Sequence, residues 1–233
     1  MSGRRGMMAG GGRAAVPDGY VTDGLVFFLD GKQLVSAAGW TDIIGGKTFA
    51  LTNCSVGTNG IVFDGTAYGL YNGAVSSDWE NETIEVVFSD YPITSNTSVA
   101  LKPMVLVSQP TINNALGIGL RFGDEGNYIR VVMATDGVRR SLRMFAKSTF
   151  PTRIGTNADR AIINEGNPEN LTSQSSYSAN TSGKTVLGAR TFTGDTVSAF
   201  YTGTIHAVRI YSRKLTEAEI KANQQNDATY YGL

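Results

Sequence analysis

The chain has 233 residues, of which 41% are apolar and 28 are glycine, so it is long enough to form a single all-β domain with its own core. Its 20 basic and 20 acidic residues balance, and no overall charge therefore favours nucleic acid or an acidic substrate. The single cysteine, Cys54, excludes an internal disulfide framework and a cysteine-based zinc cluster, and no segment is long and apolar enough to cross a membrane. We expect Cys54 to be a small buried or half-buried residue rather than a nucleophile.

Residues 1–19 are rich in glycine and show no hydrophobic periodicity, so we expect a flexible N-terminal arm before a domain at residues 20–233. The arm contains Arg4, Arg5 and Arg13 but no apolar run after the arginines, so it is not a secretory signal. Two interpretations remain open: a disordered tail, or an arm that orders against a neighbouring subunit as its arginines pair with carboxylates. The lack of a signal predicts a protein that stays in the cell, leaves it by another route, or is released by lysis as part of a particle.

Short apolar runs separated by turn residues predict a series of strands in the first half of the chain. Residues 25–29 are continuously apolar, which is typical of a buried strand, and residues 48–52 and 60–63 form two shorter runs. Residues 83–89 predict a central strand. We expect the polar residues 93–103 to form a loop.

In residues 116–122, apolar side chains alternate with Gly117, Gly119 and Arg121. This period of two predicts a strand with one apolar face and one face of small or charged residues. Two glycines on the same face often mark a place where something packs closely over a sheet.

The later part of the chain contains the clearest hairpin of the sequence. Residues 128–134 and 138–145 flank an Asp-Gly pair, which suits a tight turn that needs positive φ. Residues 151–183 are polar and predict a long surface excursion with at most one short strand, near residues 161–164. Residues 185–190 predict the penultimate strand.

The last part of the chain reads as a strand, a short turn and a capped helix. Apolar and β-branched residues crowd residues 204–211, which predicts the strand. Thr216 and Glu219 have the spacing of a capping box, and Leu215 and Ile220 flank them as a hydrophobic staple would. This is the one convincing helix in the sequence.

Residues 200–220 follow the pattern aromatic-x-Gly-x-Ile-x-x-Val-Arg-Ile-Tyr-x-Arg-x-Leu-Ser/Thr-x-x-Glu-Ile. Residues 23–30, 40–53, 62–68 and 83–88 agree with the earlier segments of the same family. The chain thus resembles the concanavalin A-like lectin/glucanase superfamily, in particular its laminin-G-like jelly-roll domains. The resemblance spans about residues 20–227 and implies an all-β, two-layer antiparallel sandwich with one short C-terminal helix. It implies much less about function, because this fold serves lectins, adhesion modules, hydrolases and viral structural proteins alike.

Glu80, Glu82 and Glu85 form the most tempting catalytic cluster. The retaining glucanases of the superfamily carry Glu-x-Asp-x-x-Glu on one strand, with the two working carboxylates about 5–5.5 Å apart. Here the central Asp is replaced by Glu82, and two of the three glutamates precede the predicted strand. We therefore favour a structural role for Glu85, with a hydrogen-bonding partner if it points inward. A glucanase-type glycoside hydrolase is the alternative.

His206 is the only histidine, so a site with several histidine ligands is impossible. No Gly-x-Ser-x-Gly motif accompanies it, and a hydrolase triad is therefore not indicated. On a strand with a period of two, His206 would share a face with Thr204, Val208 and Ile210. We expect a packed strand residue whose ring nitrogens are hydrogen-bonded.

Carbohydrate binding would need an aromatic platform with planar polar groups beside it. Core or rim packing is the alternative role for each aromatic residue. No cofactor is indicated, and the loop carboxylates that could take part in binding Ca²⁺ also favour turns without any metal, so we assign no metal ligand. The glycan-binding candidates are Trp40, Trp79, Tyr128, Tyr177 and Arg190, and the loop carboxylates are Asp64, Asp124, Glu125 and Asp195.

Together these observations predict a non-catalytic, lectin-like binding or structural module. The arm, the missing signal and the family resemblance favour a virion surface protein of a bacteriophage, such as a capsid decoration or fibre protein. In that interpretation Arg4, Arg5 and Arg13 dock on other virion subunits, and the sandwich contacts polysaccharide. We expect no nucleic-acid or membrane partner.

Overall fold

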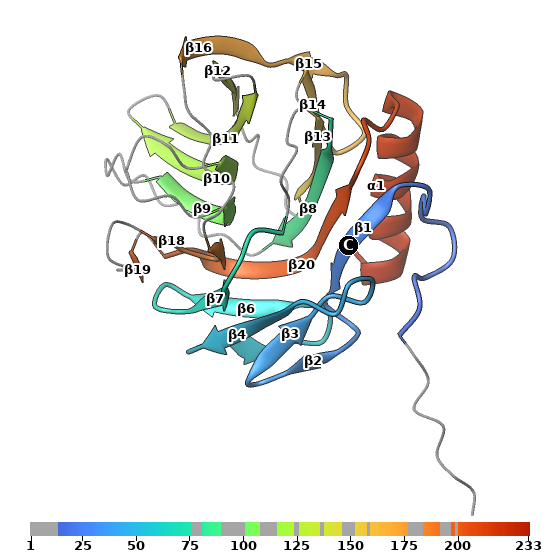
Figure 1. Cartoon of the computed structure of the whole chain (residues 1–233), viewed down its shortest axis with the longest axis vertical. Coiled ribbons are helices and arrows are strands. Elements are labelled where there is room, and N and C mark those ends of the chain that lie inside the picture. The colour runs from blue at the N-terminus through green and yellow to red at the C-terminus, as the bar shows by residue number, and fades with distance from the viewer. Residues whose placement is uncertain are drawn as a thin grey trace, which may run out of the picture.

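A computed structural model describes residues 14–75, 81–89, 101–107, 116–123, 126–135, 138–145, 152–157, 159–176, 184–191, 197–198 and 200–233. For the strands between residues 101 and 145 the description covers the backbone and its pairing. The described residues form an antiparallel β-sandwich with one helix near the C-terminus (Figure 1).

The first sheet has eight strands among the described residues. It contains the first and the last described strands of the chain, β1 and β20. Its order is β15-β14-β13-β8-β20-β6-β5, and β1 also pairs with β20. Its strands are β1 Leu25–Asp30, β5 Ser55–Val56, β6 Ile61–Asp64, β8 Thr83–Ser89, β13 Thr152–Asn157, β14 Arg160–Ile163, β15 Glu169–Asn170 and β20 Thr202–Tyr211.

The second sheet has ten described strands, in the order β16-β12-β11-β10-β9-β17-β7-β4-β3-β2. A separate pair joins β18 Arg190–Thr191 to β19 Val197–Ser198. The strands of the large sheet are β2 Val35–Ser36, β3 Gly39–Thr41, β4 Thr48–Thr52, β7 Tyr68–Tyr71, β9 Leu101–Val107, β10 Leu116–Gly123, β11 Gly126–Thr135, β12 Val138–Phe145, β16 Thr172–Ser176 and β17 Thr185–Leu187.

The main core lies between the two sheets. It takes Ile84, Val86 and Phe88 from β8, and it takes Phe49 and Leu187 from the opposite sheet. Burial of such side chains contributes roughly 1.5–3 kcal/mol each, so this interface is the main source of stability. All seven residues of β8 are buried, as predicted for a central strand, because the next layer covers its other face.

That next layer is the helix α1, Glu217–Tyr231, which packs on the outer face of the eight-stranded sheet (Figure 1). The predicted capping box is confirmed, since Glu219 N donates to Thr216 Oγ1 and Thr216 N donates to Glu219 Oε2. Leu215 and Ile220 lie in one buried cluster, as predicted for the staple. The helix ends at Gly232 in the left-handed conformation, which glycine adopts without steric cost.

The N-terminal segment joins this layer from residue 14 onward. Ala14 and Val16 pack on the cluster beneath α1, and Gln33 Nε2 donates to Ala15 O over 3.0 Å. Asn226 Nδ2 donates to Gly19 O. Residues 14–19 of the expected arm therefore contact the domain, while residues 1–13 lie outside the described residues.

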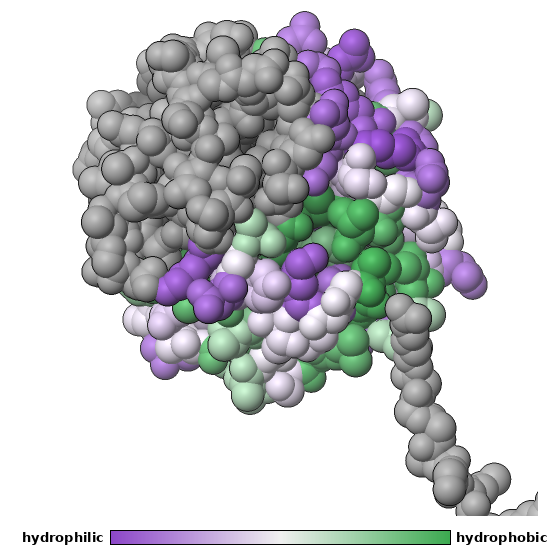
Figure 2. Space-filling view, in the orientation of Figure 1, coloured by the Kyte–Doolittle hydropathy of each residue, from purple (hydrophilic) through white to green (hydrophobic). Residues whose placement is uncertain are grey.

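The surface of this view divides by polarity (Figure 2). Apolar residues gather where β1 and α1 meet, and hydrophilic residues gather toward the end of the molecule where α1 begins. The large apolar side chains that are exposed among the described residues are Val26, Leu34 and Val56.

The short strand expected near residues 161–164 is present as β14, but the interpretation of the rest of residues 151–183 as a surface excursion is wrong for the part that the structure describes. The described part of this segment forms β13, β14, β15 and β16. Strand β13 pairs with β8 and lies under α1, and its residues Thr156 and Asn157 are buried. Thr156 Oγ1 donates to Arg160 O over 2.9 Å. A strand that contains Gly155 and these buried polar residues shows no apolar period, which is why the sequence pattern missed it.

The loop predicted over residues 93–103 is too long at its C-terminal end, because β9 already begins at Leu101. Pro103 stands opposite Gly119, next to a register irregularity in the pairing of β9 with β10. Proline cannot donate to a strand ladder and is tolerated at such irregularities. The predicted strand over residues 185–190 is shorter than expected, because β17 ends at Leu187, and it is not the penultimate strand, because β18 and β19 precede β20. The remaining predicted strands are confirmed, and the pairing of Thr135 with Val138 confirms the hairpin.

Candidate functional site

A buried ion cluster joins the eight-stranded sheet to α1. Arg209 of β20 donates from Nε to Glu85 Oε2 of β8 at 2.7 Å. Its two terminal nitrogens donate to the two carboxylate oxygens of Asp227 at 2.6 and 2.7 Å, and Asp227 comes from α1. All three residues are almost fully buried. Such a bidentate pair fixes orientation as well as charge.

Aromatic rings and a hydrogen-bonded hydroxyl surround this guanidinium. The ring centroid of Tyr20 lies 4.6 Å from Arg209 Cζ. The Tyr20 hydroxyl donates to Asp227 Oδ1 at 2.9 Å. Neither Arg209 nor Asp227 was predicted as a site residue from the sequence. The signal for Arg209 was its position between Val208 and Ile210, where a charge within an apolar strand demands a buried partner.

Glu85 has no open route to a substrate in this arrangement. It is 2% exposed, and Asn223 Nδ2 of α1 donates to its Oε2 at 2.9 Å. Its Oε1 has no hydrogen-bond partner, and burial raises the pKa of Glu85 to about 7. Glu82 is also buried and precedes β8, while Glu80 lies outside the described residues. Glu85 has the inward orientation and the hydrogen-bond partners expected for a structural residue.

His206 is a packed residue with both ring nitrogens bonded, as expected. Its Nδ1 lies 2.9 Å from Asn59 O, and its Nε2 lies 2.7 Å from Ser89 Oγ. A carbonyl oxygen only accepts, so Nδ1 carries the proton and Nε2 accepts from the serine. The predicted shared face holds for Thr204, whose strand partner Ser89 also bonds the His206 ring. It is wrong for Val208 and Ile210, which lie in the core, because a register shift between Ile205 and Ala207 breaks the alternation, and the His206 ring lies beside Tyr231.

The three glycan-binding candidates within the described residues, Trp40, Tyr128 and Arg190, belong to three different strands. The prediction that Trp40 is a glycan-binding residue is wrong. Trp40 is fully buried in the core, and its Nε1 donates to Asp30 O at 3.0 Å. Its apolar surroundings on β3 and β4 make it a core residue rather than a platform. Trp79 and Tyr177 lie outside the described residues. Arg190 pairs with Ser198 in the small β18–β19 sheet, and Tyr128 lies in β11 of the large sheet.

Strand pairing identifies which face of the large sheet points away from the core. Leu187 of β17 lies in the core. A row of directly paired residues begins at Leu187 and crosses β9, β10, β11 and β12. Directly paired residues of neighbouring strands share a face, so the whole row is on the core side. The row continues through Val105, Ile118, Val131 and Leu142.

Tyr128 belongs to the opposite face, because it is three residues from Val131 and successive residues alternate. Its direct partners are Arg121 on β10 and Phe145 on β12. The outer face of this part of the sheet therefore combines aromatic residues with an arginine. An aromatic ring can stack on a sugar, and a guanidinium offers a fork of donors to oxygens.

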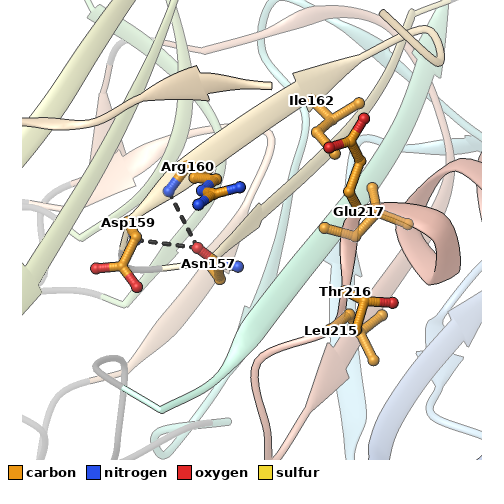
Figure 3. A pocket seen from close by; sticks show the side chains of 8 residues that line it. Asn157, Asp159, Arg160, Ile162, Leu215, Thr216 and Glu217 are labelled. Carbon is orange, nitrogen blue, oxygen red and sulfur yellow. Dashed lines mark hydrogen bonds between the residues drawn. The ribbon is translucent and has the colours of Figure 1, made fainter. Parts of the chain in front are cut away.

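A small pocket lies between α1 and the β13–β14 hairpin (Figure 3). It measures about 200 Å³ and is bordered by Asn157 and Arg160 on one side and by Thr216 and Glu217 on the other. Asn157 Oδ1 accepts from the backbone nitrogens of Asp159 and Arg160, each at 3.0 Å, so it shapes the hairpin turn. These side chains have local structural roles.

Among the described residues, no group of three or more His, Cys, Asp or Glu side chains could hold a metal ion. Asp64 forms a turn in which Thr66 N and Oγ1 both donate to its Oδ1 at 2.8 Å, and these hydrogen bonds lower the pKa of Asp64. Asp124, Glu125 and Asp195 lie outside the described residues.

Cys54 is half-buried, and desolvation raises its pKa to about 11, which disfavours the thiolate.

No helix in the described part of the chain is long and apolar enough to span a membrane.

No protein-family model and no curated protein sequence matches the chain. Solved structures match in fold. Trypanosoma rangeli sialidase in complex with sialic acid aligns with a TM-score of 0.56 at 15% identity, over 91% of this chain and 33% of the sialidase. The chain thus spans about a third of the length of that enzyme.

Two smaller matches have similar scores. Domain 4 of AbnA, a GH43 extracellular arabinanase from Geobacillus stearothermophilus in complex with arabinotriose, aligns with a TM-score of 0.53 at 11% identity, over 84% of this chain and 96% of the domain. A mutant of HCR/D aligns with a TM-score of 0.56 at 13% identity, over 88% of this chain and 52% of that protein. At these identities the likeness concerns the fold. The chain is an all-β, two-sheet antiparallel sandwich of the concanavalin A-like fold with a single described helix near its C-terminus, as the sequence resemblance predicted.

Proposed function

We propose that the protein is a non-catalytic carbohydrate-binding module. The observation that carries this proposal is the match to domain 4 of the Geobacillus stearothermophilus arabinanase, a structure solved with arabinotriose. The alignment covers 96% of that domain and 84% of this chain, so the two share a whole sandwich rather than a fragment. Transfer of sugar binding from that domain to this chain is the step we propose.

The most suitable surface for a sugar is the outer face of the large sheet at β10, β11 and β12. The eight-stranded sheet offers no equivalent surface over its central strands, because α1 covers the outer face of β8, β13 and β20. On the large sheet, Tyr128 shares the outer face with its partners Arg121 and Phe145. This combination suits a pyranose or furanose ring with polar substituents.

The geometry around Glu85 supports a binding role over the hydrolase alternative. A retaining hydrolase needs two carboxylates facing one substrate groove. Glu85 instead lies beneath α1 with Arg209 and Asn223 as partners. Hydrolysis by Glu85 would require the helix to leave the sheet.

We further propose that the module belongs to the surface of a bacteriophage virion, where Arg4, Arg5 and Arg13 dock on neighbouring subunits. This narrower proposal rests on the glycine- and arginine-rich composition of residues 1–13. Co-purification with capsids that requires residues 1–13 would support it. Its failure would leave the binding proposal intact.

The binding proposal is tested by affinity electrophoresis or calorimetry of the purified full chain against arabinan, β-glucan, alginate and polygalacturonate. We expect saturable binding to at least one polysaccharide and no release of reducing sugar from any. Release of reducing sugar that Glu85→Gln abolishes would overturn the non-catalytic assignment. No binding to any polysaccharide would overturn the module assignment.

A further inference from the structure

Strands β3, β4 and β7 lie toward one end of the large sheet, at the bottom of Figure 1. Leu187 lies in the core and pairs with Gly69 of β7, so Gly69 faces the other sheet. Successive residues of a strand alternate between the two faces, and Tyr68 and Leu70 of β7 therefore face outward. Both side chains are half-exposed.

The outer positions of these three strands carry no charge. The direct partners of Tyr68 and Leu70 on β4 share their face, and so do the paired positions on β3. Thr48 and Ala50 of β4 are exposed. The surface is therefore polar in part but electrically neutral, and it gives no advantage to an anionic ligand. The outer positions are Gly39, Thr41, Thr48, Ala50, Thr52, Tyr68 and Leu70.

Two half-exposed aromatic rings border this surface. Phe200 precedes β20, and its ring centroid lies 6.2 Å from that of Tyr68, with the ring planes 44° apart. The half-exposed rings of Tyr71 and Tyr230 pack on core clusters. Neither Tyr68 nor Phe200 belongs to a core cluster of the described residues, so part of each ring is available to a ligand.

Two hydroxyl groups beside the rings are also available. Tyr68 pairs directly with Thr52, and neither hydroxyl makes a hydrogen bond to another of the described residues. The hydroxyls of Thr41 and Thr48, by contrast, bond each other at 2.9 Å. A sugar presents an apolar face next to its own hydroxyl groups, so an aromatic ring with free hydroxyls beside it suits a sugar.

This surface is separate from the outer face at β10, β11 and β12. Strand β17 lies between β7 and β9 in the sheet. Val186 is at the outer position of β17, next to the core residue Leu187, and it is fully buried. The atoms that cover Val186 interrupt the outer face, so the two areas can be tested independently.

We infer that Tyr68 and Phe200 form the platform of a second sugar-binding surface, which takes a neutral oligosaccharide. The inference rests on the proposed function and adds a site to it. The rings offer stacking area, and the hydroxyls of Tyr68 and Thr52 can each donate and accept. A uronate would lose part of the hydration of its carboxylate here without gaining a cationic partner at the outer positions.

The test measures binding of the purified full chain to arabinan and β-glucan, with Tyr68→Ala and Phe200→Ala as the variants. We expect each variant to lose affinity about tenfold or more, as truncation of a central aromatic contact does. Val56→Ala is the control, because Val56 is 48% exposed on β5 of the other sheet. It should change the affinity by less than about twofold.

Two milder variants keep the test decisive if the alanine variants fail to fold. Tyr68→Phe keeps the ring and removes the hydroxyl, so we expect a loss of about threefold. Phe200→Leu keeps an apolar side chain without a flat face, and we expect it to lose about tenfold. Binding of the neutral polymers should be equally tight at low and high salt, because no outer position is charged.

Each outcome decides between the two proposals. Polysaccharide binding that none of the Tyr68 and Phe200 variants changes would overturn the platform and leave the binding module intact. Salt-sensitive binding of alginate that is tighter than that of arabinan and is lost in Tyr68→Ala would overturn the neutral ligand class. Binding to no polymer at all would overturn the proposed function itself.

Discussion

Arg209 is the residue on which the attachment of the helix depends most. Its guanidinium is fully buried and has two carboxylate partners, one from β8 and one from α1. A buried charge is costly unless it is paired, so the three residues stabilise the fold only as a complete set. The cluster therefore fixes where α1 lies on the sheet.

Asp227→Asn should destabilise the protein strongly, because Arg209 would keep its buried charge with one anionic partner fewer. Removing one partner of a buried ion pair costs about 3–5 kcal/mol. The free energy of unfolding in urea measures the loss. Glu217→Gln on the same helix is the control, since its pair with Lys221 is half-exposed and a change within about 0.5 kcal/mol is expected. A small effect of Asp227→Asn would mean that the cluster does not hold the helix.

Glu85 should make the stability depend on pH near neutrality. Burial raises its pKa to about 7, so the folded state holds the proton more tightly than the unfolded state, whose glutamate titrates near 4.3. The stabilisation is therefore complete below about pH 4.3 and is lost as the pH rises through about 7. The slope is at most about 1.4 kcal/mol per pH unit for one proton.

The free energy of unfolding between pH 5 and pH 8 measures this dependence. We expect it to fall with rising pH in the natural chain and to be flatter by up to one proton in Glu85→Gln. Glu217→Gln should keep the slope of the natural chain. Identical slopes in all three proteins would show that Glu85 stays ionised beside Arg209 throughout this range.

At the scale of elements, the contact between α1 and β13 depends on a glycine. A Cβ atom at Gly155 would lie 2.3 Å from Ile220 Cγ2, which is far inside van der Waals contact. Ile220 Cβ, by contrast, lies 3.5 Å from the same position. The close approach of helix to sheet is thus set by the absence of one side chain.

Gly155→Ala should cost about 1–3 kcal/mol, as is typical of overpacking in a buried contact. Ile220→Ala alone should also destabilise, because it removes a buried side chain. The double variant should be more stable than the sum of the two single effects predicts, since alanine at position 220 makes room for the new methyl group. Urea unfolding of the four proteins gives this coupling energy, and simple additivity would contradict the contact.

At the scale of the whole molecule, the sandwich has three layers where α1 is present. The large sheet and the helix cover opposite faces of the eight-stranded sheet. Phe28 and Val87, both at most 1% exposed, lie on the face that α1 covers. The helix is therefore part of the core rather than an appendage.

A chain that ends at Leu215 should lose cooperative folding. The truncation would expose the apolar residues beneath α1 and would leave Arg209 without Asp227. We expect no cooperative thermal transition in near-ultraviolet circular dichroism, together with aggregation. A transition close to that of the full chain would show that the two sheets fold without the third layer.

The sequence alone determined the class of fold and most of the strands, because these depend on local patterns. The continuous burial of residues 83–89 and the Asp-Gly hairpin after Thr135 follow from short-range periodicity and turn chemistry. The capping box at Thr216 is equally local. Tyr128 was identified as a candidate from the sequence, although nothing local shows which arginines lie beside it.

Tertiary structure decided what depends on residues distant in the chain. Trp40 became a core residue because Asp30 and the opposite sheet enclose it. Strand β13 formed because its backbone pairs with β8, while Thr156 and Asn157 hydrogen-bond to residues of β14 and the turn before it. The pairing of Arg130 with Arg143 depends on strand register, which places two like charges together that the sequence separates by 13 residues. Burial and pairing are properties of the assembled layers, so a residue's role in this protein follows from its partners across the sheet.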